Sequence, residues 1–218
     1  MLIDSCHLCH KILWRLHDSL CVKCQESFLQ SDLIYRELTD KNGEILPVVS
    51  LFQYIGEAGR LVRSLKGGNL KNLTAVLTEC LAQKVSPQLF EHVGCVIPVP
   101  AQNWGELDHA ARIGRHLANY FRAPYFDQHL ERKGFEAQKL KPLEARQSVE
   151  IHMRTAFSGG TIAGSKERHQ SGVLLLVDDV ITTGSTLLQA WHALGRPRAL
   201  GVTLSSTPRL VENMPKIW

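Results

Sequence analysis

The chain has 218 residues, of which 44% are hydrophobic and 21% are charged, and its formal net charge is +4. These values are typical of a globular protein with one sizeable core and room for a small additional module. No run approaches the roughly 18 apolar residues of a membrane span, and the charge is too small to indicate a nucleic-acid partner by itself.

The first ten residues, MLIDSCHLCH, carry Asp4 and two cysteines where a secretory signal would need an apolar stretch. We therefore expect a cytoplasmic protein. Because that compartment is reducing, the six cysteines are expected to bind metal or to lie buried, and not to form disulfides.

Four of the cysteines form two pairs, Cys6-x2-Cys9 and Cys21-x2-Cys24, separated by eleven residues. Each pair brings two thiolates from one tight turn to the same ion, and two pairs complete a tetrahedral Zn2+ site. A segment this short has too little core to fold alone, so the metal would contribute its folding free energy. We predict a zinc-binding module over residues 1–32 and a second domain over residues 33–218.

Three other interpretations of the cysteines stay open. CHLCH also fits the pattern for c-type haem attachment, although that leaves Cys21 and Cys24 without a role. A redox-active dithiol is a second possibility, and His7 or His10 in place of one cysteine ligand is a third. The two remaining cysteines, Cys80 and Cys95, are expected to be buried as small apolar side chains.

The elements expected after the cysteines follow from hydrophobic periodicity and turn residues. Lys41-Asn42-Gly43 is typical of a type I′ turn between strands at residues 33–38 and 45–55. Residues 57–84 are predicted as two helices broken at Gly67-Gly68. The later elements are a strand at 94–100, a helix at 106–121, a basic turn-prone segment from 130 to 149, a strand at 173–177, a helix at 185–194 and a strand at 199–207. This alternation predicts an α/β fold with a largely parallel sheet.

The stretch VLLLVDDVITTGSTL, residues 173–187, places Asp178 and Asp179 at the end of the most apolar strand. The loop and helix that follow would lie at the carboxyl end of the sheet, where α/β proteins bind ligands. Backbone N–H groups and hydroxyls at the start of a helix suit a phosphate, whereas two carboxylates suit ribose hydroxyls or Mg2+. A sugar phosphate satisfies both halves, with the phosphate on Thr182, Thr183, Gly184, Ser185 and Thr186.

The competing interpretation of this stretch is an ordinary strand end followed by a capped helix. One acid and one threonine would be enough for that purpose. A Walker-type phosphate loop is excluded, because G-x4-G-K-[ST] does not occur in the chain.

The stretch VLLLVDDVITTGST resembles the phosphoribosyl-pyrophosphate motif of type I phosphoribosyltransferases. With four cysteines ahead of it, the chain is similar to the ComF family of competence and DNA-utilisation proteins. The resemblance implies a type I phosphoribosyltransferase fold with a small N-terminal zinc module. It also implies a cytoplasmic role in handling single-stranded DNA during natural transformation.

If the chain is an enzyme, the resemblance implies displacement of pyrophosphate from ribose C1 of phosphoribosyl pyrophosphate (PRPP). Asp178 and Asp179 would be the catalytic acids, with Mg2+ bridging pyrophosphate and ribose hydroxyls. The chain departs from the family after PVP at residues 98–100, where arginines are usual, and Asp108 and His109 stand where Asn and Gln are expected. Val149 also replaces a usual asparagine. These departures leave the enzyme question open.

A basic segment could contact the backbone of single-stranded DNA and stack one base. It comprises Arg132, Lys133, Phe135, Lys139, Lys141 and Arg146. Three glutamates, Glu131, Glu136 and Glu144, dilute it, so a solvated loop is the alternative. Three functions therefore stay open: a ComF-like DNA-uptake protein that keeps the sugar-phosphate pocket, a working phosphoribosyltransferase of nucleotide salvage, and a zinc scaffold for a partner protein.

Overall fold

A computed structural model describes residues 5–13, 19–67, 71–89, 93–101, 108–133, 150–153 and 172–208. In the N-terminal half, the elements are α1 (Val22–Gln30), β1 (Ile34–Thr39), β2 (Ile45–Gln53), α2 (Gly56–Gly67), α3 (Lys71–Leu89) and β3 (Val93–Pro98). In the C-terminal half, they are α4 (His109–Phe121), β4 (Leu130–Lys133), β5 (Glu150–Met153), β6 (Val173–Ile181), α5 (Ser185–Ala193) and β7 (Ala199–Ser206).

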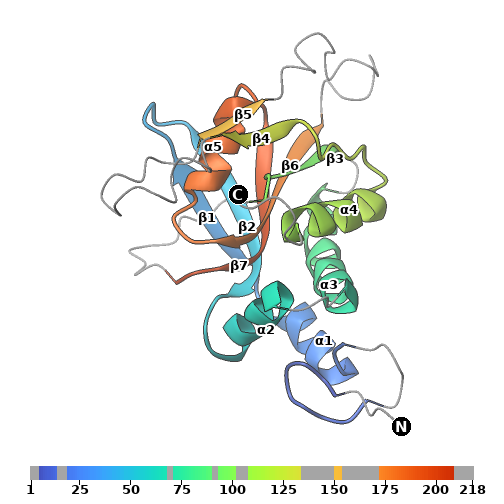
Figure 1. Cartoon of the computed structure of the whole chain (residues 1–218). Coiled ribbons are helices and arrows are strands. Elements are labelled where there is room, and N and C mark those ends of the chain that lie inside the picture. Colours follow the sequence, from blue (N-terminus) through green and yellow to red (C-terminus); the bar gives the residue numbers. More distant parts are fainter. Residues whose placement is uncertain are drawn as a thin grey trace.

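The central sheet has five strands in the order β1-β2-β7-β6-β3. β2, β7, β6 and β3 run parallel, and β1 pairs antiparallel with β2. Helices flank the sheet (Figure 1). The predicted α/β fold with a largely parallel sheet is therefore confirmed.

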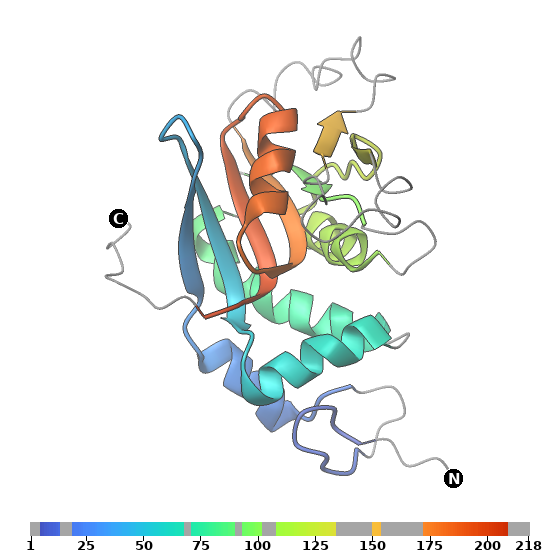
Figure 2. The same cartoon turned by 60° about the vertical axis from the view of Figure 1, so that its left-hand side comes forward.

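The strand β6 shows why the sheet is covered on both faces. Leu174 and Leu176 are buried in one apolar cluster with Trp191 of α5. Val173, Leu175 and Val177, which alternate with them, are buried in the other cluster with α3 and α4. A continuous apolar run is what a parallel strand needs when both of its faces are covered. Figure 2 shows α5 on one side of the sheet and α4 on the other.

The chain leaves β3 and β6 toward opposite faces of the sheet. After β3 the chain passes through α4 to Tyr125, which bridges to Val96 on the outer side of β3. After β6 the chain passes through α5, on the opposite face, to β7 on the inner side. The carboxyl ends of β3 and β6 thus lie at a topological switch point, the position where open α/β sheets bind ligands.

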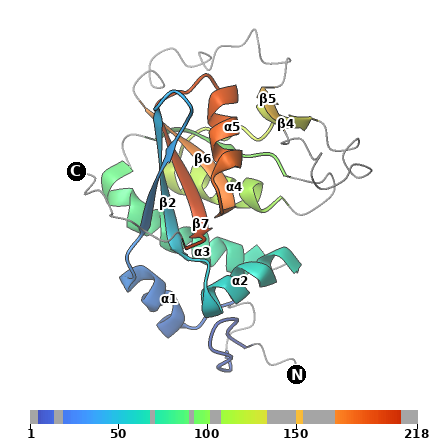
Figure 3. The same cartoon turned by 90° about the vertical axis from the view of Figure 1, so that its left-hand side faces the viewer.

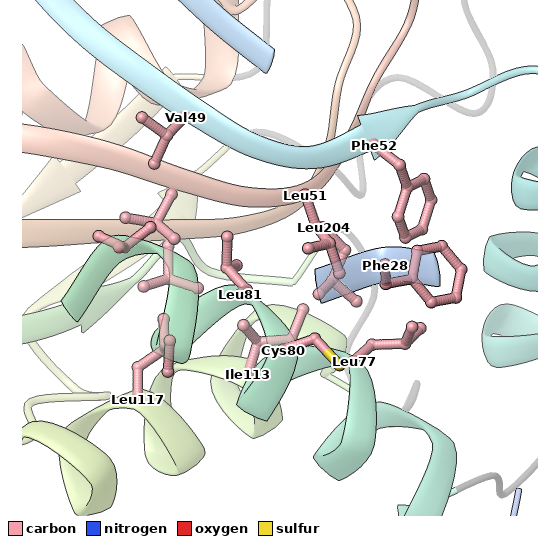
Figure 4. Packing of buried hydrophobic residues seen from close by; sticks show 14 of the residues in the cluster. Phe28, Val49, Leu51, Phe52, Leu77, Cys80, Leu81, Ile113, Leu117 and Leu204 are labelled. Atoms are coloured by element: carbon pink, nitrogen blue, oxygen red, sulfur yellow. The ribbon is translucent and has the colours of Figure 1, made fainter. Parts of the chain in front are cut away.

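The N-terminal segment packs against the main core. Phe28 of α1 lies 5.2 Å from Phe52 of β2 between ring centroids, and both belong to the cluster around Leu77 and Leu81 of α3 (Figure 4). The Lys84 Nζ of α3 donates to the carbonyl oxygens at the end of α1, at 3.1 Å to Phe28. The predicted boundary after residue 32 falls in the link between α1 and β1.

The predicted hairpin is confirmed by the pairing of β1 with β2, but the predicted turn type is wrong. A type I′ turn needs positive φ at both central residues, and here only Gly43 of the turn has it, at 81°. The N–H of Gly43 donates to the Asp40 carbonyl, and the Asp40 carboxylate accepts from the N–H groups of Asn42 and Glu44. The aspartate therefore stabilises this turn through its own side chain.

The Asp40 carboxylate also holds the hairpin tip to the far end of α5. His192 Nε2 lies 3.1 Å and Arg196 Nε 3.2 Å from its Oδ2, and the Asp40 side chain is fully buried. The hairpin tip lies at the opposite end of the molecule from the N-terminal segment (Figure 3). One carboxylate thus joins β1, β2 and α5.

We expect this carboxylate to make stability depend on pH. Burial raises the pKa of Asp40, but its backbone N–H donors and the charge of Arg196 outweigh burial, so the pKa lies below the usual 3.8. Because the folded pKa is the lower one, the stabilisation is complete above the unfolded value and is lost as the pH falls through the folded value. Thermal denaturation from pH 6 to pH 2 should therefore show a steeper loss below about pH 4 in the wild-type protein than in Asp40→Asn. Equal slopes for both proteins would contradict the assignment.

Three further differences from the sequence prediction have physical reasons. The helix predicted from residue 106 begins at His109, because Asp108 has an extended backbone and its carboxylate accepts from the Ala111 N–H as an N-cap. Residues 130–133, predicted as turn-prone, form β4, which pairs with β5 as a separate two-stranded sheet. α1 was not predicted either, since within its span only Cys24 and Phe28 are buried.

No helix in the part of the chain that the structure describes is long and apolar enough to cross a membrane.

Candidate functional site

The first cysteine pair is held by a small hairpin-like loop. Ser5 bridges antiparallel to Ile12, the Cys6 N–H donates to the Lys11 carbonyl at 2.8 Å, and the His10 N–H donates to the Cys6 carbonyl at 2.9 Å. His10 takes a positive φ of 60°, which closes the turn. Cys6 is fully buried and Cys9 is exposed.

The second pair is placed by the start of α1. Cys21 is the residue before the helix, and its carbonyl accepts from the Cys24 N–H at 3.0 Å. The His7 N–H donates to the Ser19 carbonyl and so ties the first loop to the second. Two separate turns therefore present four thiols to one point.

The four thiol groups converge, with all sulfur atoms within 4.8 Å of one another and Cys9 3.7 Å from Cys21. Zn–S bonds of about 2.3 Å in a tetrahedron place sulfurs about 3.8 Å apart, so the cluster fits a zinc ion. Among the described residues, His7 and His10 are not part of this group. The predicted tetracysteine group could therefore hold a metal ion such as zinc.

Charge at the cluster also fits metal binding. Burial raises the pKa of Cys6, but backbone N–H groups, including that of Cys21 at 3.4 Å, outweigh it and lower the pKa to about 6. Burial and the neighbouring thiols raise the pKa of Cys24. One thiolate is thus stable at neutral pH, whereas four need a cation.

The second candidate site lies at the carboxyl end of β6. Asp178 and Asp179 are half-buried, and the Asp179 N–H donates to the Asp178 carboxylate at 2.8 Å. The pair lies next to the switch point between β3 and β6. Burial and the charge of Asp179 raise the pKa of Asp178 to about 7.

The loop after β6 leads into a helix whose N-cap residue is a glycine. Gly184 precedes α5 with φ 85° and ψ 2° and has no side chain to cap the helix, and the Thr183 hydroxyl accepts from the Ser185 N–H at 3.3 Å. The side chains of Thr182, Thr183 and Ser185 are exposed, and Thr186 is half-buried. The first-turn N–H groups of a helix have no carbonyl acceptor within it, so an acceptor such as a phosphate oxygen could bind there.

Gly184 lies close to a side chain of the protein's own core, whereas from the sequence we expected this glycine to contact a phosphate. A Cβ at this position would clash with a methyl group of Leu38 on β1. The missing side chain therefore makes room for the protein's own core as well as for the turn.

The structure adds two charged residues to the acid pair. Arg132 of β4 donates through Nε to the Pro100 carbonyl after β3, at 2.7 Å. Burial lowers the pKa of Arg132, and the carboxylates of Asp178 and Asp108 oppose that effect. Burial and the charge of Asp179 raise the pKa of Asp108. Three carboxylates and one guanidinium thus share the same electrostatic environment.

A polar row continues from the acid pair across the sheet. Asp178 is in register with Thr203 of β7, whose hydroxyl lies 2.6 Å from that of Ser50 on β2. Sequence reasoning missed Thr203 and Ser50, although hydroxyls inside otherwise apolar strands are a usable signal. The sequence indicates Arg132 only as a member of the basic segment, and not as a neighbour of the acid pair.

The structure places the two predicted groups of site residues at separate places. The cysteines converge next to α1, and the residues from Asp178 to Thr186 lie together at the end of β6 and the start of α5. Most of the predicted DNA-contact segment, residues 134–149, lies outside the described residues. Arg132 is half-buried and faces the carboxylates.

Sequence comparisons do not assign a family to the chain. No protein-family model matches it. No curated protein matches it in sequence.

Proposed function

We propose that the chain is a ComF-like cytoplasmic protein of DNA uptake that binds a phosphoribosyl group at the end of β6 through a type I phosphoribosyltransferase-like domain. The observation that carries the proposal is the position of Asp178 and Asp179 at the switch point, with the N-cap residue of α5, Gly184, which has no side chain, five residues further on. The acids would accept hydrogen bonds from the ribose hydroxyls. The loop would bind the 5′-phosphate.

The alternative of a simple strand end is less consistent with this geometry. The N-cap residue of α5 is Gly184, which has no side chain to accept from the second or third N–H of the helix, while the Thr183 hydroxyl accepts only from the Ser185 N–H. A strand end does not need two adjacent half-buried carboxylates, one of which has its pKa raised to about 7. Both features have a purpose if a polyhydroxylated anion binds between them.

Two metal ions belong to the proposal. Zn2+ would be held by Cys6, Cys9, Cys21 and Cys24 and would stabilise the N-terminal segment. Mg2+ would be held near Asp178 and Asp179 together with PRPP, where it supplies charge neutralisation of the pyrophosphate. The protein's own residues would bind the phosphate, orient the ribose and exclude water from one face of it.

The proposal is tested by isothermal titration with PRPP and, separately, with ribose 5-phosphate, each with Mg2+ present. Asp178→Asn with Asp179→Asn keeps the side-chain shapes and removes both charges. Each hydrogen bond to a carboxylate contributes about 1.5–3 kcal/mol, so the affinity of the double variant should fall at least about 100-fold.

Glu57→Gln is the matched control, because Glu57 is an exposed carboxylate on α2 with a side chain 65% exposed. It should leave the affinity unchanged. Wild-type protein that binds neither ligand, or a double variant that binds as tightly as wild type, would contradict the proposed site.

An active phosphoribosyltransferase is the second candidate function, favoured by the pKa of Asp178. A carboxyl group that titrates near neutrality is suited to proton transfer. The same variants should then lose pyrophosphate release from PRPP in the presence of nucleobases, and the pH profile should carry an apparent pKa near that of Asp178. Binding without any pyrophosphate release would favour the binding function.

Single-stranded DNA is the proposed partner beyond the sugar phosphate. The support is the ComF resemblance and the basic residues between Arg132 and Arg146. Binding through the DNA backbone should weaken steeply as the salt concentration rises. Binding that is insensitive to salt would contradict backbone contact by these residues.

A further inference from the structure

One arginine far away in the sequence holds the loop that follows the acid pair. Arg36 of β1 donates through Nη2 to the Thr182 carbonyl at 3.0 Å and through Nη1 to the Ser206 hydroxyl at 3.0 Å. It lies 146 positions before Thr182 in the sequence. Its guanidinium thus links the edge strand to the last residue of β7 and the first residue of the loop.

The contact determines how the loop's peptide groups point. In a trans peptide the carbonyl of one residue and the N–H of the next residue point in opposite directions. A hydrogen bond that fixes the carbonyl therefore also fixes the direction of the next N–H, which points away from the group that donates to the carbonyl. The Thr207 N–H holds the Ile181 carbonyl at 2.9 Å, and Arg36 holds the Thr182 carbonyl. The N–H groups of Thr182 and Thr183 are thereby oriented by residues outside the loop.

The same strand also fixes the helix that follows. Leu38 packs against Gly184 at the start of α5, and the Asp40 carboxylate binds His192 near its end. Arg36 and Leu38 therefore act next to each other at the start of the helix. The direction of the first-turn N–H groups depends on this strand.

We propose that Arg36 is a positioning residue for phosphate binding, one that aligns the peptide group between Thr182 and Thr183 before the ligand arrives. This inference rests on the proposed phosphoribosyl site. A planar guanidinium can reach two acceptors in fixed directions, whereas a lysine ammonium is a single flexible point charge. Pre-aligned donors bind an anion more tightly because less order is lost on binding.

Two measurements test the proposal on the full chain with Arg36→Ala. The backbone amide NMR order parameters of Thr182 and Thr183 in the unliganded protein should fall, and the affinity for ribose 5-phosphate should fall about tenfold or more. Methylguanidine added to the variant should restore part of both effects. Arg36→Lys should recover only a fraction of the affinity.

Arg60→Ala is the matched control, since Arg60 is an arginine on α2 whose side chain is 68% exposed. It should change neither measurement. Thermal denaturation of each variant checks that the chain is folded, and Ser206→Ala provides a milder second variant that should loosen the same contact with a smaller effect.

The outcomes separate this inference from the proposed function. Loss of affinity without lower order parameters would mean that Arg36 touches the phosphate directly, and that overturns the positioning role. Lower order parameters with unchanged affinity overturn it as well. If wild-type protein binds no sugar phosphate, the proposed function fails, while lower order parameters that methylguanidine restores still support Arg36 as the residue that orders the loop.

Discussion

Removing zinc from the four-cysteine cluster is expected to unfold the N-terminal segment and to lower the stability of the whole chain. Structural zinc contributes on the order of 10 kcal/mol to small zinc modules, and the segment has little core without it. Cys6 and Cys24 also belong to the cluster that contains Phe28 and α3, so the loss should extend into the main core. Chelation should lower the melting temperature by more than about 10 °C and reduce the helix signal of α1.

Single cysteine substitutions distinguish the stability that comes from metal binding from the stability that comes from side-chain packing. Cys9 is exposed, so Cys9→Ser removes a ligand without creating a cavity. Cys80→Ala is the control, because Cys80 is buried but lies outside the cysteine cluster. The first variant should lose zinc and stability, and the second should keep its zinc. Absence of zinc from freshly purified protein, measured by elemental analysis, would remove the assignment.

Gly184→Ala is expected to be the most damaging single substitution in the loop. An L side chain in the left-handed region costs about 1–2 kcal/mol, and overpacking a buried position costs about 1–3 kcal/mol more. Its Cβ would meet the side chain of Leu38, which is buried at 2% exposure. The melting temperature should fall by on the order of 10 °C.

The chain contains a control for this substitution. Gly195 has nearly the same φ, 80°, but nothing lies within 4 Å of a Cβ there. Gly195→Ala should therefore show the backbone cost alone, about 1 kcal/mol. Adding Leu38→Ala to Gly184→Ala should relieve the clash, so the two changes should cost less together than their separate costs added. Equal costs at Gly184 and Gly195 would show that Leu38 does not limit this position.

The sequence was informative where one local pattern carries the physics. The apolar run before Asp178 predicts a strand covered on both faces, and β6 confirms it. Cys-x2-Cys spacing predicts a converging thiol group, and the four sulfurs lie together. The pattern failed where an element is short or polar, as in β4 and β5, whose four residues each are stabilised by pairing with each other.

What only the tertiary structure decided is which distant residues lie next to a local motif. The acid pair and its loop are readable from consecutive residues, because a strand, a turn and a helix start follow one another in the chain. Arg36, Leu38 and Arg132 come from strands remote in sequence, and no periodicity relates them to Thr182 or Asp178. Register and strand order bring them together, and these depend on long-range pairing across the whole sheet. The sequence alone therefore determined the candidate ligand groups. The fold decided which distant residues form hydrogen bonds with the loop, pack against it and act on the charges of the acid pair.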